Sequence, residues 1–175
     1  MWKPCKNNGV CIDTETPPGF KCNCKKRPSL MEVREEDCAE DVAFRKGCLQ
    51  STTYGHPYGP NKAVDGYSFT HSSTSLGKGP AQWWRVDFKS LKVIDDVKIE
   101  LNAYPSASGY TVSMSNTSDF HVSQHCYTIK VDQHSRREVA FKCLVSVVAQ
   151  FMKIQLRSDE ARIALYKVIV FGWDV

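Results

Sequence analysis

The sequence predicts an all-β protein in which a small disulfide-rich module precedes a β-sandwich or barrel. Five of the eight cysteines lie within the first 38 residues. From about residue 40 onward, short segments rich in β-branched and aromatic residues are separated by turn-forming segments. No long helical pattern lies between these segments, which argues against an α/β fold.

The first module, residues 1–39, is defined by its cysteines: Cys5, Cys11, Cys22, Cys24 and Cys38. The triplets "NNG" and "PPG" supply turns between them. Dense cysteine with little apolar content is typical of a small module that is held together by disulfides in an oxidising compartment. The spacing lacks the Cys-x2-Cys pairs of zinc sites, but the disulfide pairing cannot be fixed from the sequence.

The segment "SLMEVREEDCAEDVAFRKG", residues 29–47, bridges the two parts and is compatible with a short helical turn. The second part, residues 40–175, contains segments with strand character: 93–103, 110–116, 126–133, 136–143, 150–158 and 165–173. In the first of them Val97, Ile99 and Leu101 alternate with charged residues, which predicts one buried face.

An earlier strand segment is "QWWRVDF". We expect Trp83 and Trp84 to bury large areas, each with a partner for its indole N–H. Arg85 and Asp87 are two positions apart, so they share a strand face and predict an ion pair or contacts to neighbouring backbone.

A pair of cysteines predicts a further disulfide in the second part. Cys126 and Cys143 lie on two strand segments joined by the turn "DQHS". A disulfide between them would close a hairpin and contribute about 3 kcal/mol of stability.

Charge and motifs exclude several classes of function. The net charge of +4 is too small to indicate nucleic-acid binding, and "KKR" at residues 25–27 is typical of a solvated loop. The chain contains no run of about 18 apolar residues, so we expect no membrane insertion. No Ser/His/Asp or Cys/His constellation and no phosphate-binding glycine loop is present, so we expect no enzyme activity.

Two features predict a secreted protein or an extracellular part of a larger one. The cysteines indicate an oxidising compartment. The triplet "NTS" makes Asn116 a candidate glycosylation site. The start "MWKP" lacks an apolar leader, which suggests a fragment or an added Met.

The stretches "PCKNNGVC" and "FKCNC" in residues 1–39 resemble an EGF-like domain from its second cysteine onward, truncated before its first cysteine. The resemblance implies disulfides Cys5–Cys22 and Cys24–Cys38. It leaves Cys11 without its usual partner, and Cys48 is then the spare thiol, with their pairing open.

The second part resembles the F-type lectins, or fucolectins, within the galactose-binding, discoidin-like group. "NKAVDG", "THSS", "WWRVDF", the pair Cys126 and Cys143, "FMKIQL" and "ALYKVIVFG" occur in the family's order over roughly residues 40–173. The resemblance implies a jelly-roll β-sandwich. It does not by itself identify the ligand, because function depends on the site and not on the scaffold.

The resemblance implies a sugar site made of one histidine and two arginines from a later loop. His71 keeps the histidine, but Asn102 stands about where the first arginine belongs, and no Arg or Lys lies between Lys98 and Lys130. We therefore expect that the domain does not bind fucose in the family's way. The candidate ligand-binding residues are Tyr54, Tyr58, His71, Asn102 and Tyr104.

Family members also bind calcium in the "AVDG" loop. Asp65 is present and Ser68 offers a further oxygen, but calcium needs six to eight oxygen ligands and this loop looks short. Lys167 stands where the resemblance implies an acid, so we expect it to pair with Asp65. We expect no cofactor and no bound calcium.

Three functions remain open. The first is an extracellular recognition or adhesion module that contacts a protein or glycan through the loops at Tyr54–Tyr58, His71 and 102–110. The second is an active lectin in which His71, Asn102 and Tyr104 bind a sugar other than fucose. The third is a structural spacer in a larger extracellular protein.

Overall fold

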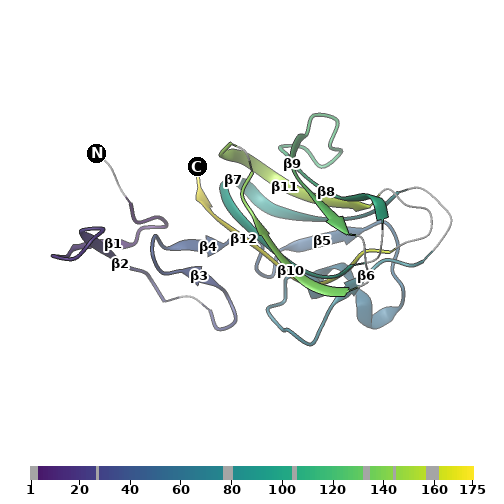
Figure 1. Ribbon diagram of the computed structural model, residues 1–175, viewed down its shortest axis with the longest axis horizontal. Coiled ribbons are helices and arrows are strands. Elements are labelled where there is room, and N and C mark those ends of the chain that lie inside the picture. The colour runs from purple at the N-terminus through teal and green to yellow at the C-terminus, as the bar shows by residue number, and fades with distance from the viewer. Residues whose placement is uncertain are drawn as a thin grey trace.

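The computed structural model describes residues 4–26, 28–76, 81–103, 106–131, 135–143, 145–156 and 162–175. The fold is the all-β sandwich that the sequence predicts (Figure 1). Its helices in the described ranges are two short 3-10 turns, η1 (His56–Tyr58) and η2 (Pro60–Ala63). Within the same ranges, no helix has the length and apolar character needed to span a membrane.

The N-terminal module is an antiparallel hairpin with two disulfides. Strand β1 (Val10–Asp13) pairs with β2 (Phe20–Asn23). The predicted disulfides Cys5–Cys22 and Cys24–Cys38 form. The EGF-like resemblance and the domain boundary after residue 39 stay predictions.

The two remaining thiols lie apart and do not pair. Cys11 is exposed in β1, whereas Cys48 is buried in the core of the sandwich. Burial raises the pKa of the Cys48 thiol to about 12, so it stays protonated at neutral pH. Cys48 is therefore a core residue. Its burial could not be predicted from the sequence, which does not show which face of this strand packs against the core.

The bridge extends the main sheet and contains one turn. Strands β3 (Val33–Arg34) and β4 (Ala39–Asp41) pair with each other, and β4 also pairs with the C-terminal strand β12 (Ala164–Asp174). Between them, the N–H of Cys38 donates to the carbonyl of Arg34 at 2.8 Å, which closes the expected single turn.

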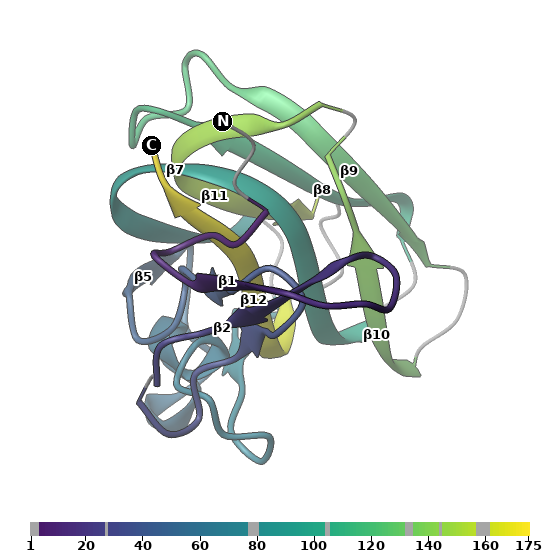
Figure 2. The same cartoon turned by 90° about the vertical axis from the view of Figure 1, so that its left-hand side faces the viewer.

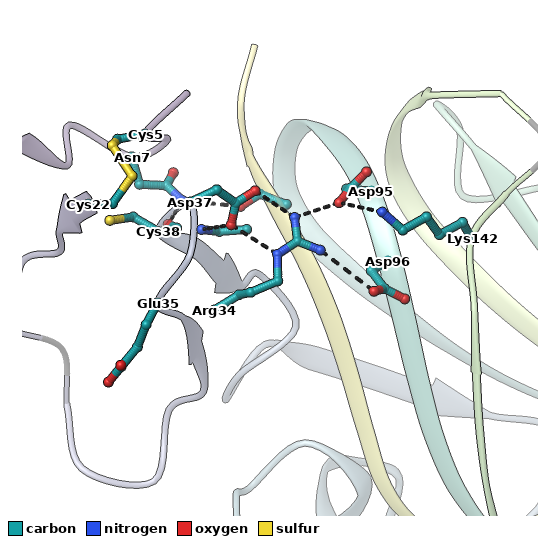
Figure 3. A network of polar contacts seen from close by, with 12 residues as sticks. Cys5, Asn7, Cys22, Arg34, Glu35, Asp37, Cys38, Asp95, Asp96 and Lys142 are labelled. Carbon is teal, nitrogen blue, oxygen red and sulfur yellow. Dashed lines mark hydrogen bonds and ion pairs between the residues drawn. A yellow bond between two sulfur atoms is a disulfide. The ribbon is translucent and has the colours of Figure 1, made fainter. Parts of the chain in front are cut away.

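Polar contacts hold the N-terminal module against the sandwich (Figure 3). The Arg34 guanidinium binds Asp37 at 2.6 Å and Asp95 at 2.5 Å, and Asp95 also contacts Lys142 at 3.4 Å. The Asn7 amide donates to the carbonyls of Cys38 and Gly172. Figure 2 shows the hairpin in front of this end of the sandwich.

The sandwich has two layers because one strand passes through both. The strands are β5 (Gly47–Gln50), β6 (Ser72–Ser73), β7 (Gln82–Ala103), β8 (Ser106–Ser115), β9 (Gln124–Val131), β10 (Ser135–Phe141), β11 (Val147–Leu156) and β12. The first half of β7 pairs with β5 and β11, and β8 and β9 continue that layer. The second half of β7 pairs with β10 and β12. The strand bends near Lys89, whose φ is 76° (Figures 1 and 2).

The core lies between the two halves of β7. Buried side chains follow the strand alternation on both sides of the bend: Trp84, Val86, Phe88, Val97, Ile99 and Leu101. The predicted burial of Val97, Ile99 and Leu101 is confirmed. The disulfide Cys126–Cys143 forms as expected and joins β9 to the residues after β10.

The two adjacent tryptophans have different environments. Trp84 is fully buried and its indole N–H donates to the carbonyl of Pro60 at 2.9 Å. Trp83 is only partly buried, because its side chain points to the outer face of the sheet. The prediction of large burial holds for Trp84. Arg85 and Asp87 share the outer face, and the second of the two predicted alternatives is confirmed. Arg85 donates to the carbonyl of Ser118, and Asp87 accepts the N–H of Lys89 at 2.7 Å and also binds the Lys89 ammonium at 3.1 Å.

Candidate functional site

His71 lies between two tyrosine rings at one end of the sandwich. Its ring centroid is 4.7 Å from that of Tyr58 in η1 and 4.8 Å from that of Tyr166 in β12. His71 directly precedes β6, which pairs with β12 at Leu165. This short pairing brings the imidazole to β12, although 95 residues separate His71 from Tyr166 in sequence.

Two arginines add positive charge around this histidine. The Arg136 guanidinium, on β10, lies 4.0 Å from the ring centroid of Tyr166. The Arg162 guanidinium, just before β12, lies 4.8 Å from the ring centroid of Tyr54. Tyr54 in turn contacts Tyr58, with ring centroids 5.6 Å apart.

The surroundings keep the His71 imidazole neutral. Burial of the ring lowers the pKa of His71, and the charges of Arg162 and Arg136 lower this pKa further. At neutral pH the imidazole therefore carries one N–H donor and one acceptor nitrogen.

The sequence does not predict the two guanidiniums beside His71. Arg136 and Arg162 come from β10 and from the approach to β12, and not from the loop in which the resemblance implies arginines. The sequence contains both residues, but only the strand pairing places them at the histidine. The alternation of "SRREVAF" indicates an outward Arg136 without showing what lies beside it.

Arg136 is held in position by the elements around it. Its Nε donates to the Glu100 carboxylate at 2.6 Å, and its Nη2 donates to the carbonyl of Ser68 at 3.3 Å. Asn102 stands directly opposite Arg136 in the pairing of β7 with β10. The structure thus brings Tyr54, Tyr58, His71 and Asn102 to one region, whereas Tyr104 lies outside the described residues.

The Asp65 loop is closed by its own hydrogen bonds. The Asp65 carboxylate accepts the Thr70 hydroxyl at 2.9 Å and the Tyr67 N–H at 3.0 Å, and lies 3.7 Å from Lys62. These donors occupy the carboxylate lone pairs that calcium needs. In the part of the chain that the structure describes, no group of three or more His, Cys, Asp or Glu side chains is placed to hold a metal. The Thr70 hydroxyl also lies 3.4 Å from the Lys62 carbonyl oxygen and 3.2 Å from that of Tyr67. The absence of bound calcium stays a prediction.

The predicted pair of Lys167 with Asp65 is wrong. The Lys167 ammonium binds Glu32 of the bridge instead, because the bridge extends the sheet beside β12 and places an acid over the lysine. Ser68 is exposed, and it is the Ser68 carbonyl that contacts Arg136. Asn116 is exposed in the turn after β8, and its glycosylation stays a prediction.

A family model of NedA-like, galactose-binding domains matches residues 62–154, which is more than half of the chain. The chain belongs to this family. This galactose-binding domain has no match among curated proteins.

Solved structures with the same fold include carbohydrate-binding modules and lectins. Chitosan-binding module 1 of a chitosanase/glucanase from Paenibacillus sp. IK-5 is 22% identical, with a TM-score of 0.61, over 75% of this chain and 98% of that one. The F-lectin from Morone saxatilis serum is 18% identical, with a TM-score of 0.66, over 77% of this chain and 49% of that one. A fucose-binding module of Streptococcus pneumoniae is 21% identical, with a TM-score of 0.61, over 79% and 99%. At these identities the likeness shows the fold, and the jelly roll that the resemblance implies is confirmed.

Proposed function

We propose that this galactose-binding domain binds a glycan at the His71 site, which we define as Tyr54, Tyr58, His71, Arg136, Arg162 and Tyr166. The observation that carries the proposal is a neutral imidazole between two tyrosine rings with two guanidiniums beside it. Solved relatives that are named for binding chitosan, fucose and the Lewis B antigen support it.

The chemistry of these groups suits a sugar. Guanidinium N–H groups donate to hydroxyl and ring oxygens, and hydrogen bonds to a charged group contribute about 1.5–3 kcal/mol each. The neutral imidazole both donates and accepts, so it binds a hydroxyl in either role. The tyrosine faces supply an apolar surface for the C–H face of a sugar ring.

The elements that carry the two arginines affect which sugar the site would bind. Because they come from β10 and from the approach to β12, their donors approach a bound sugar from directions that the F-type lectin resemblance does not imply. We therefore propose a sugar other than fucose, bound without calcium. The three disulfides favour a secreted or extracellular protein, and we propose binding rather than catalysis.

A protein partner is the second candidate, favoured by an exposed aromatic pair beside the site. Phe69 is 79% exposed and packs against Tyr67, with ring centroids 5.3 Å apart. Ser68 between them touches Arg136. Exposed aromatic residues of this kind anchor protein contacts.

A glycan array with purified protein tests the proposal. We expect binding to a set of glycans without fucose that a calcium chelator does not change. Arg162→Ala should weaken binding at least about tenfold, which is the loss of one charge-assisted contact. His71→Ala should also weaken it, by the loss of a neutral hydrogen bond and of the ring contact. Arg137→Ala is the matched control, because Arg137 is the next residue of β10 and bonds to the Lys130 carbonyl, away from His71. No glycan binding by the wild type would refute the proposal and favour the protein partner. Fucose binding that His71→Ala abolishes would refute the proposed specificity.

A further inference from the structure

A hollow lies on the layer of the sandwich opposite to the His71 site. Two adjoining cavities of about 220 and 440 Å³ share Arg85 and Ser118 in their linings. The smaller cavity lies over Trp83 and Arg85 of β7 and Lys153 of β11, beside the loop after β8, residues 118–120. The larger cavity continues over β5 and the following part of β7, toward Asn61 and Lys89. We call the two cavities together the β7/β11 groove. The His71 site instead uses β10 and β12, which pair with the other half of β7.

The strand register arranges the polar side chains of this face in rows. Arg85 of β7 stands directly opposite Lys153 of β11, which stands opposite Ser113 of β8. In the next row, Trp83 stands opposite Gln155. All of these side chains are partly exposed, so the face offers cations, a hydroxyl, an amide and an indole ring to solvent.

The central feature is the cation pair formed by Arg85 and Lys153. Like charges directly opposite each other in a ladder destabilise a sheet. Here aromatic rings support them: the Arg85 guanidinium lies 5.7 Å from the Trp83 ring centroid, and the Lys153 ammonium lies 4.6 Å from that of Phe120. Arg85 also donates to the carbonyl of Ser118, which fixes the loop over the groove.

The carboxylates of the groove are engaged elsewhere. Asp87 accepts hydrogen bonds from Lys89 and Gln150. Asp119 accepts the Thr117 hydroxyl and the N–H of His121. An anion that lies between Arg85 and Lys153 would gain charge-assisted hydrogen bonds from both side chains.

We propose that the β7/β11 groove binds an acidic saccharide. Its carboxylate or sulfate lies between Arg85 and Lys153, and the neighbouring sugar ring packs on the exposed part of Trp83. Ser113 and Gln155, on the same sheet face beyond the smaller cavity, bond to hydroxyls further along the chain. The larger cavity continues in the other direction, toward β5 and Lys89, and has room for a further sugar unit. This site is independent of the His71 site.

Binding to defined hexasaccharides tests this site by calorimetry and by NMR shifts. A hyaluronan hexasaccharide supplies carboxylates, a heparin-derived hexasaccharide supplies sulfates, and chitohexaose at neutral pH is a ligand without anionic groups. We expect at least one acidic hexasaccharide to bind, with an affinity that falls as salt rises, and with shifts at Ser113 and Gln155 that chitohexaose does not produce.

Variants separate the two sites. Lys153→Gln keeps a polar side chain and should weaken the acidic ligand at least about tenfold, whereas Arg162→Ala at the His71 site and Arg137→Gln on β10 should leave it unchanged. An unchanged thermal transition shows that Lys153→Gln folds. The proposal is overturned if neither acidic hexasaccharide binds, or if Arg162→Ala abolishes binding while Lys153→Gln does not.

Discussion

At the scale of single residues, the environment of His71 differs from the exposed turn that its neighbours in sequence predict. The residue is a turn histidine in "FTHSS", yet two tyrosine rings and two guanidiniums surround it. Because its pKa is lowered from 6.5, the unfolded chain takes up a proton first as the pH falls below 6.5. Acidification below pH 6.5 therefore lowers the free energy of unfolding through this residue. In the folded protein, the imidazolium that forms repels both arginines.

The first prediction concerns this titration. Arg162→Ala should raise the pKa of His71 toward its ordinary value, because one of the two charges that oppose protonation is removed. The imidazole shifts in an NMR pH titration measure this directly. Arg137→Ala should leave the titration as it is. An identical His71 pKa in wild type and Arg162→Ala would show that Arg162 does not face the imidazole in solution.

At the scale of elements, one buried carboxyl joins β4 to β12. Asp41 is 5% exposed, and its Oδ1 accepts the N–H of Ala43 at 3.0 Å and that of Val170 at 3.1 Å. Burial raises the pKa of Asp41 from 3.8 to about 7, against the lowering effect of these two hydrogen bonds. The attachment of β4 to β12 therefore depends on the Asp41 carboxyl, whose pKa lies near neutral pH.

The second prediction uses the sign of that shift. Between pH 3.8 and about 7 the folded protein holds the Asp41 proton and the unfolded chain does not. The stability from this group is complete below pH 3.8 and is lost as the pH rises to about 7.

Asp41→Asn keeps an oxygen acceptor but does not titrate. The free energy of unfolding of the variant relative to the wild type should therefore rise with pH, which urea unfolding at pH 4.5 and pH 7.5 measures. A difference between the two proteins that stays constant or falls with pH would contradict the raised pKa.

At the scale of the whole molecule, the N-terminal module is a fixed part of one body. Arg34 links the bridge to Asp95 of β7, and Asn7 reaches the carbonyl of Gly172 in β12 (Figure 3). The Lys6 ammonium lies 4.4 Å from the ring centroid of Trp173. These contacts, together with the apolar cluster of Ala39, Ile169, Phe171 and Trp173, join the module to the sandwich. We therefore expect the two parts to unfold together.

The third prediction tests this attachment. Arg34→Met should destabilise the protein by about 1–3 kcal/mol, because it leaves Asp37 and Asp95 without their main donor. Hydrogen exchange should rise in β3 and β4 before it rises in β7. Lys142→Met is the control: its side chain is 62% exposed and touches Asp95 at 3.4 Å, so a change of less than about 1 kcal/mol is expected. Equal protection of β3 in Arg34→Met and wild type would show that other contacts hold the module.

Much of the fold followed from local patterns in the sequence. The alternation around Ile99 determined which face of β7 is buried, and the cysteine spacing with the family resemblance gave all three disulfides. His71 was found because its motif is local. Strand alternation, cysteine spacing and the histidine motif are all patterns of residues in the sequence, so they can be recognised without knowing the tertiary structure.

Only the tertiary structure decided the composition of the two candidate sites. Arg136 and Arg162 reach His71 because β10 and β12 both pair with β7, and Lys153 stands beside Arg85 because β11 pairs with its other half. The sequence does not show which strands become neighbours. Strand pairing joins residues far apart in the chain, and charges act on each other through space, so the chemistry of both faces appears only when the sheet is assembled.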